Sequence, residues 1–219
     1  MANKLYPEGA IQGIADAIRS LNGGTNTYKV SQMAAAISAL PTGSGDADEL
    51  AAIFDRTISG TYTTSTTEIN QLYAFASCTA LSSINLPNCS FIGTSAFYSC
   101  TGLTTISCPK VKALSNYCFY GCWNLSSIKF DEMIITIPSN AFQSCYNLLS
   151  VNLIPASEPT LGVIPTGLAN VNAFTSTPIS TYTTSTGGVY GSIYVPASLV
   201  ASYKAATNWV TYSARIVGV

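Results

Sequence analysis

The side chains that usually carry out catalysis or bind metals are sparse in this sequence. The chain of 219 residues has no histidine, which excludes Ser-His-Asp and Cys-His nucleophile systems and every zinc site with a histidine ligand. Its ten carboxylates are spread thinly: Asp46, Asp48 and Glu49 lie in or just after a linker, and Asp131 is next to Glu132. No acid–base pair is indicated, and a solvated turn explains the adjacent pair. We therefore expect no enzymatic activity, no cofactor and no metal.

Seven cysteines are the remaining reactive side chains, and their spacing includes no Cys-x-x-Cys pair. Their number is odd, and four of them fall on an internal repeat. A buried free thiol behaves as a small hydrophobe, and we expect this role here. A disulfide framework is the alternative. The cysteines are Cys78, Cys89, Cys100, Cys108, Cys118, Cys122 and Cys145.

The chain is nearly neutral and has few charges. Charged residues make up 9% of it, with nine basic and ten acidic side chains, against roughly 25% in an ordinary domain. Nucleic-acid binding depends on clustered lysine and arginine, so we expect no nucleic-acid partner. No apolar run reaches the roughly 18 residues that a membrane span needs, and residues 1–9 lack the apolar core of a secretory signal. We expect no membrane insertion and no export from the cytoplasm by the usual route.

The strongest signal is an internal repeat of 22 or 23 residues. Four segments share an Ala/Cys-Phe-x-x-Cys pattern, and apolar residues follow three, six and eight positions after the last cysteine of each. Such a unit buries its apolar face only against its neighbours, so equivalent residues should form ladders. We expect the following Leu-x-x-Ile-x-Leu stretch to be a short strand with its isoleucine inward, and the cysteine segment to be an opposite wall of helical or 3₁₀ turns. The four segments are 74–78, 96–100, 118–122 and 141–145.

This pattern resembles the BspA-type leucine-rich repeat, which occurs in bacterial surface adhesins and in phage tail proteins. Residues 193–209 are similar to the end cap of that family, and so are 159–162, 172–174 and 177–178. The resemblance covers the chain from about residue 55 onward. We therefore expect an α+β solenoid: a short leucine-rich-repeat stack of about four repeats, with an N-terminal helical hairpin and a C-terminal cap. The ligand is not implied, because repeat scaffolds serve many partners.

The first 40 residues have the pattern of a small helical hairpin. Apolar residues occur at helical spacing in 10–21 and again in 31–40, with Asn22-Gly23-Gly24 between them. This front end resembles the N-terminal module of virion proteins of phages that infect Gram-positive bacteria. Because so short a hairpin cannot hold a core, we expect its apolar faces to trimerise or to dock on other virion proteins; folding back onto the first repeat is the alternative. The assembly candidates are Ile11, Ile14, Ile18, Leu21, Met33, Ile37 and Leu40.

The order of these segments predicts four regions. Residues 1–40 are the attachment and oligomerisation hairpin, and 41–56 are a Gly- and Ser-containing linker with a lead-in helix. Residues 57–154 are the leucine-rich repeats, and 155–219 are a C-terminal repeat and cap. The hydroxyl-rich stretch 57–67 should be an edge strand or loop at one end of the solenoid.

Two surfaces of the repeats are candidate binding sites. Outward residues of the strands form a polar, nearly uncharged face suited to hydrogen bonds with sugar hydroxyls, unless they are simply solvated. Aromatic residues flank the cysteines where the core does not require them, which is typical of a carbohydrate or protein contact surface; partial burial against neighbouring turns is the alternative. The polar candidates are Ser83, Asn85, Thr105, Ser107, Ser127, Lys129, Ser150 and Asn152, and the aromatic candidates are Tyr98, Tyr120, Trp123 and Tyr146.

These features predict a phage virion structural protein, either a short fibre or a receptor-binding component. Its N-terminal helices would attach to the particle, and its repeats would bind a glycan or protein of the host cell surface. By analogy with phage fibres, we expect a homo-oligomer, with a trimer favoured. The alternative is a bacterial surface adhesin or a protein- or glycan-binding module outside a virion; it fits the repeats equally well, but the sequence shows no export signal or wall anchor.

Overall fold

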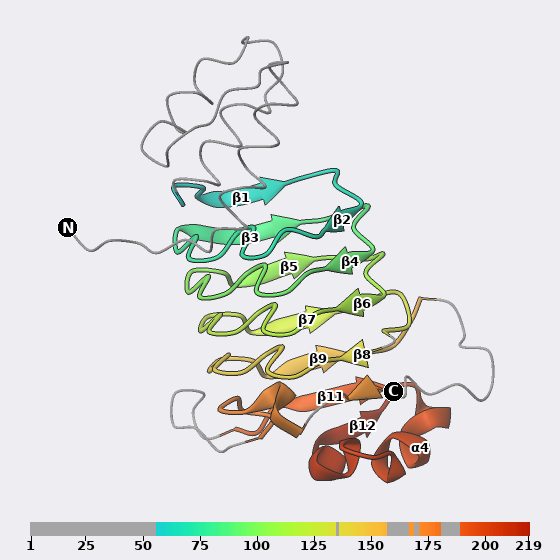
Figure 1. Ribbon diagram of the computed structural model, residues 1–219. Coiled ribbons are helices and arrows are strands. Elements are labelled where there is room, and N and C mark those ends of the chain that lie inside the picture. Colours follow the sequence, from blue (N-terminus) through green and yellow to red (C-terminus); the bar gives the residue numbers. More distant parts are fainter. Residues whose placement is uncertain (1–55, 135, 157–166, 169–170, 181–188) are drawn as a thin grey trace, which may run out of the picture. The chain divides into compact units, whose positions relative to one another are not determined.

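The computed structural model describes residues 56–219 apart from 135, 157–166, 169–170 and 181–188 (Figure 1). The chain divides into two compact units, Met1–Ile58 and Ser59–Val219. None of the helices among the described residues has the length and hydropathy that a membrane span requires. The predicted linker and the assembly candidates Ile11, Ile14, Ile18, Leu21, Met33, Ile37 and Leu40 lie outside the described residues.

Short parallel strands form one side of the repeat unit, because each repeat returns the chain to the same point one level further along the stack. One sheet has the strand order β1-β3-β5 and another the order β12-β11-β9-β7, and β5 lies beside β7 (Figure 1). The strands are β1 (Gly60–Thr63), β3 (Leu81–Asn85), β5 (Thr105–Ser107), β7 (Ser127–Lys129), β9 (Ser150–Asn152), β11 (Ser192–Val195) and β12 (Ile216–Gly218).

The register of these strands follows the sequence repeat. Ile84 pairs with Ile106, and Ile128 pairs with Val151. These central residues are buried, whereas the residues on either side of them face outward because side chains alternate along a strand. The prediction that the Leu-x-x-Ile-x-Leu stretch is a strand with its isoleucine inward is confirmed.

A third parallel sheet, on another side of the repeats, consists of strands of two residues each, in the order β10-β8-β6-β4-β2. The second residue of each strand is apolar, and in β2, β4, β6 and β8 this residue is buried. The sheet therefore closes the core along a second side. Its strands are β2 (Glu68–Ile69), β4 (Phe91–Ile92), β6 (Ala113–Leu114), β8 (Thr136–Ile137) and β10 (Gly167–Leu168).

The cysteine segments form tight turns closed by hydrogen bonds between residues three apart, which is the 3₁₀-type turn that the sequence predicts, and the equivalent segment of the next repeat is a 3₁₀ helix, η1 (Val171–Phe174). We call residues 71–78, 93–100, 115–122 and 138–145 the turn wall. In its first layer, the Ala76 and Cys78 amides donate to carbonyls three residues back, while the Phe75 and Ser77 amides donate to the next repeat at 2.7 Å each. Hydrogen bonds within each turn thus alternate with hydrogen bonds to the next layer, and the latter join the layers as in a parallel sheet.

Left-handed backbone makes this arrangement possible. Ser77, Ser99 and Ser144 have φ of 60°, 57° and 61°, at the position where Gly121 has φ of 70°. A residue with a Cβ pays a steric cost of about 1–2 kcal/mol in this conformation, and glycine does not.

Replacing Ser144 with glycine should therefore stabilise the protein. The steric relief exceeds the extra chain entropy that glycine loses on folding, so we expect the free energy of unfolding to rise by roughly 0.5–1 kcal/mol. A Ser144→Val variant should lose about 1–2 kcal/mol, because a β-branched residue is strained at this φ. Urea unfolding followed by circular dichroism measures both, and a Ser144→Gly protein less stable than wild type would refute the explanation.

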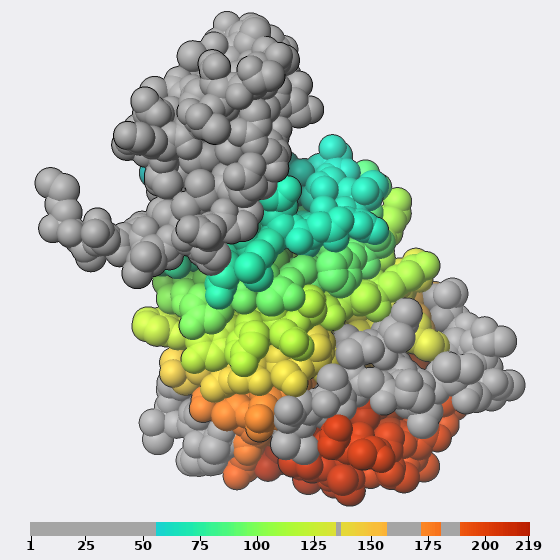
Figure 2. All heavy atoms as spheres, viewed as in Figure 1, coloured from blue at the N-terminus to red at the C-terminus, as the bar shows by residue number. Residues whose placement is uncertain are grey.

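A ladder of phenylalanine rings fills the core between the strands and the turn wall. Neighbouring ring centroids lie 5.2, 5.4, 5.4 and 5.5 Å apart with interplanar angles of 3–9°. Such offset stacking adds to the stabilisation from burial. Figure 2 shows the repeats that surround this ladder as closely packed layers in chain order. The rings belong to Phe75, Phe97, Phe119, Phe142 and Phe174.

Helical elements cover the C-terminal end of this core (Figure 1). The buried ring of Tyr212 meets Phe174, the last ring of the ladder, edge-on at 5.3 Å, and Tyr203 meets Trp209 edge-on at 5.0 Å. These rings keep the last layer of the core from solvent. The covering elements are η3 (Ala197–Leu199), α4 (Val200–Ala205) and η4 (Trp209–Arg215), whereas η1 (Val171–Phe174) carries Phe174 and forms the last layer of the wall itself.

Candidate binding surfaces

The eight polar candidates lie on one face, the outer side of the first set of strands. Thr105, Ser107, Ser127 and Lys129 are exposed, whereas the four residues from β3 and β9 are partly buried. Residues of β1 and β11 extend the face at both ends, and sequence reasoning missed them although they show the same alternation. The register within each sheet, continued from β5 to β7 by the 22-residue repeat, defines two lines of side chains: Thr61, Ser83, Thr105, Ser127, Ser150 and Ser192, and Thr63, Asn85, Ser107, Lys129, Asn152 and Tyr194.

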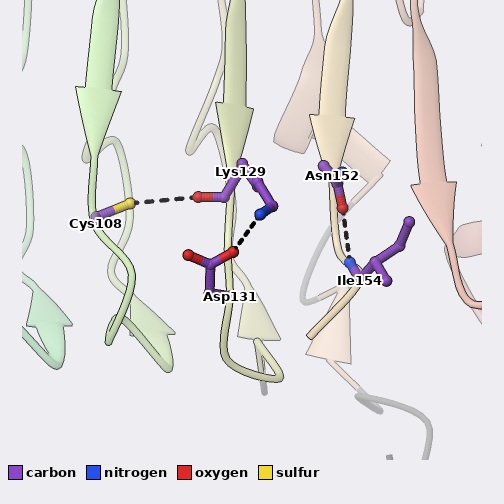
Figure 3. Close-up of polar contacts among 5 residues, drawn as sticks. All are labelled: Cys108, Lys129, Asp131, Asn152 and Ile154. Atoms are coloured by element: carbon purple, nitrogen blue, oxygen red, sulfur yellow. Dashed lines mark hydrogen bonds and ion pairs between the residues drawn. The ribbon is translucent and has the colours of Figure 1, made fainter. Parts of the chain in front are cut away.

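Four of the few charges near this face form two pairs, and Lys110 Nζ donates to Asn88 Oδ1 at 3.0 Å. Lys129 Nζ lies 2.6 Å from Asp131 Oδ1 (Figure 3), and Lys112 Nζ lies 3.7 Å from Glu132 Oε2. Asn152 is also engaged locally, since its Oδ1 accepts a hydrogen bond from the Ile154 amide at 2.9 Å (Figure 3). Exposed pairs of this kind contribute little to stability, and the face presents no cluster of a single charge sign.

The aromatic candidates divide into two groups on the turn wall and at its edge. Tyr98 and Tyr120 are half-buried and stack at 4.7 Å with an interplanar angle of 6°. Tyr73 and Tyr117 complete this tyrosine group, with ring centroids 6.0 Å from Tyr98 and 5.9 Å from Tyr120, respectively. Partial burial against neighbouring turns therefore describes Tyr98 and Tyr120, whereas Tyr117 is 38% exposed.

The second group is the Trp–Tyr pair, Trp123 and Tyr146. The two ring centroids lie 6.1 Å apart with an interplanar angle of 37°. The side chains are 50% and 40% exposed, and the nearby Leu149 is 37% exposed. Each ring directly follows a ladder cysteine, where the chain leaves the turn wall for the strand. These rings are presented to solvent rather than to the core.

The seven thiols are buried and free, as predicted. Three of them donate hydrogen bonds to phenylalanine carbonyls of the preceding repeat: Cys100 to Phe75 at 2.9 Å, and Cys122 and Cys145 at 3.1 Å each. Burial raises the pKa of the Cys108 thiol to about 12 and the pKa of the Cys145 thiol further. A thiol that stays protonated is a structural donor and a poor nucleophile. The part of the chain that the structure describes holds no cluster of three or more metal-ligating side chains.

Stacked parallel strands, ladders of identical core residues and a 22-residue period define a leucine-rich-repeat protein, a scaffold of the binding-module type. The model of the BspA type leucine rich repeat region matches residues 67–185, more than half of the chain. The chain belongs to this family. The match counts six copies, whereas the cysteine register singles out four; terminal repeats commonly depart from the central pattern.

Two solved structures of leucine-rich-repeat proteins are similar to the chain. The protein from T. pallidum has 26% sequence identity and a TM-score of 0.45, and the match covers 60% of this chain and 53% of that one. The protein from Bacteroides ovatus has 19% identity and a TM-score of 0.47, with 73% and 36% covered. The chain thus spans about half the length of the first protein and about a third of the second. None of the curated protein sequences matches significantly.

Proposed function

We propose that the chain is an adhesive structural component of a phage particle, a short fibre or receptor-binding protein. Residues 1–40 attach it to other virion proteins and join copies of the chain, and the repeats present a binding surface to the host cell. The observation that carries the adhesive role is the exposed Trp–Tyr pair at the edge of the turn wall. The virion role rests on the resemblance of residues 11–37 to attachment modules of phage proteins.

Several properties of the Trp–Tyr pair favour a contact surface over an accident of packing. Tryptophan and tyrosine are the residues most enriched at binding hot spots, because they offer large, rigid areas that are both apolar and hydrogen-bonding. The core pattern does not demand them, since the equivalent positions in the first two repeats are Thr79 and Thr101. The solubility of a chain with 9% charged residues is better served by a polar side chain at these positions. Exposed rings here are therefore best explained by a ligand.

A bacterial surface adhesin is the second candidate, because the repeats of this chain resemble the BspA-type repeats that also occur in such adhesins. The two candidates differ in where the protein resides. Mass spectrometry of particles released from cells that carry the gene, compared with the envelope fraction of the same cells, separates them. Peptides of this chain enriched in the particles would support the virion role. Peptides confined to the envelope would refute it and favour the adhesin.

A further inference from the structure

We propose that Trp123, Tyr146, Asn124 and Asn147 bind a neutral sugar ring, so that the ligand of the adhesive surface is an uncharged glycan. This inference rests on the proposed function, because it names the ligand class of the same surface. It depends on the geometry of the rings, the hydrogen bonds of the two amides, the distribution of charge and the size of the apolar patch.

Two half-exposed aromatic rings lie side by side on adjacent layers of the stack. With centroids 6.1 Å apart and planes inclined by 37°, Trp123 and Tyr146 form a shallow, angled surface. A pyranose ring has a face of C–H groups that is apolar and slightly positive. That face complements the negative face of an aromatic ring, so a sugar ring would stack on either side chain.

The amides lie next to the rings in the sequence, and their positions are fixed by a hydrogen-bonded relay. Asn124 Nδ2 donates to the Thr101 carbonyl at 2.8 Å, and Asn147 Nδ2 donates to Asn124 Oδ1 at 3.2 Å. The backbone N–H of Asn147 donates to the Trp123 carbonyl at 3.2 Å. Each side-chain amide has a second N–H and a further lone pair for a hydroxyl ligand. Because the relay has already oriented them, binding loses little side-chain entropy.

Charge is absent from the stretches that build this surface. Residues 113–128 and 133–156 contain no Asp, Glu, Lys or Arg. Lys129, which follows the first of these stretches, lies at the far end of β7 and is paired with Asp131 at 2.6 Å. Within these stretches of the described residues, a carboxylated or phosphorylated glycan would find no cation to offset its desolvation. Arg215, in the C-terminal segment, stacks over the Tyr190 ring at 3.4 Å. The site therefore suits a neutral hexose or N-acetylhexosamine.

The size of the patch favours a sugar over a protein. In these two repeats the exposed large apolar residues along this edge are Trp123, Tyr146 and Leu149, and Val189 and Tyr190 are exposed in the layer that follows, whereas a protein partner typically covers about 800 Å². The first two repeats carry Thr79-Ala80 and Thr101-Gly102 in place of the aromatic–asparagine pairs. The site thus spans two layers about 4.8 Å apart, a length that fits one or two sugar residues.

A glycan array tests this inference with the labelled full-length chain. The array carries neutral hexose and N-acetylhexosamine oligosaccharides together with sialylated and uronic-acid glycans of matched length. We expect binding to at least one neutral glycan, competed by the same free oligosaccharide. Trp123→Ala and Tyr146→Ala should each weaken it by about tenfold or more, and Asn147→Ala by severalfold. The matched control is Leu72→Ala, which removes an exposed apolar side chain from the first layer of the turn wall and should bind as wild type does; circular dichroism confirms folding.

Four results would overturn the inference. Binding confined to acidic glycans would contradict the neutral class, and neutral-glycan binding unaffected by Trp123→Ala would place the site elsewhere. Adhesion to Gram-positive cells without any glycan binding, lost when those cells are treated with protease, would identify a protein ligand and leave the proposed function intact. Absence of both glycan binding and cell adhesion would refute the inference and the proposed function together.

Discussion

Replacing Phe119 with alanine should lower the free energy of unfolding by about 3–5 kcal/mol. The ring is fully buried and stacks between Phe97 and Phe142, with centroids 5.4 Å away on both sides. Its removal loses the burial of the ring and two stacking contacts, and it leaves a cavity. The surrounding layers cannot easily close over the cavity, because hydrogen bonds between them keep their spacing fixed. One such bond runs from the Phe119 amide to the Ala141 carbonyl, at 2.9 Å. Urea unfolding followed by circular dichroism measures the loss.

A matched substitution at the surface provides the control for this prediction. Val210→Ala removes an apolar side chain that is 57% exposed, and we expect it to change stability by less than about 0.5 kcal/mol. If Phe119→Ala lost no more than about 1 kcal/mol, the layers would have to close over the gap. A continuous phenylalanine ladder would then not be what holds the stack together.

Raising the pH above 9 should destabilise the protein steeply. Burial raises the pKa of the Cys108 thiol to about 12, those of Cys118 and Cys145 still higher, and that of Cys122 well above the ordinary value of 9.0. Between these values the unfolded chain releases thiol protons that the folded chain retains. The contribution of these thiols to the free energy of unfolding is thus fully present below pH 9. Above that pH the free energy of unfolding falls by about 1.4 kcal/mol per pH unit for each thiol.

Together these four thiols should produce a slope of about 5–6 kcal/mol per pH unit between roughly pH 10 and 12. That slope is enough to unfold a domain of ordinary stability within one or two pH units. Urea unfolding at a series of pH values measures it, and a Cys118→Ala variant should show a slope smaller by about 1.4 kcal/mol per pH unit. A free energy of unfolding that stayed constant from pH 8 to 11 would contradict the burial of these thiols.

The sequence repeat was sufficient to predict the strands and most of the core. A ladder position must be apolar in every repeat, so Phe97, Phe119 and Ile128 are recognisable from spacing alone. The two-residue strands were not predicted, because a strand as short as Phe91–Ile92 or Ala113–Leu114 cannot show an alternation of apolar and polar residues. The 3₁₀-type turns of the turn wall were predicted, whereas the hydrogen bonds between its layers were not, because spacing within one repeat does not reveal them.

The candidate surfaces were predicted unevenly for similar reasons. The polar strand face follows from alternation, and only its end strands β1 and β11 were missed. The division of the aromatic residues was not predictable: Tyr98 and Tyr120 stack and are half-buried, whereas Trp123 and Tyr146 project outward. Whether each ring packs against a neighbour or projects outward depends on the backbone conformation at its position, which spacing in the sequence does not specify. The amide relay did leave a signal, an aromatic–asparagine pair repeated after 23 residues.

Competition for adsorption of phage particles to host cells tests most directly the claim that this chain is an adhesive component of the particle. Particles that contain the chain are mixed with host cells in the presence of excess purified chain, and unadsorbed particles are counted over time. We expect the wild-type chain and Leu72→Ala to slow adsorption, and Trp123→Ala to leave it unchanged, because only the first two retain the Trp–Tyr pair. Adsorption unaffected by the wild-type chain, or slowed equally by Trp123→Ala, would contradict the proposed role of this surface.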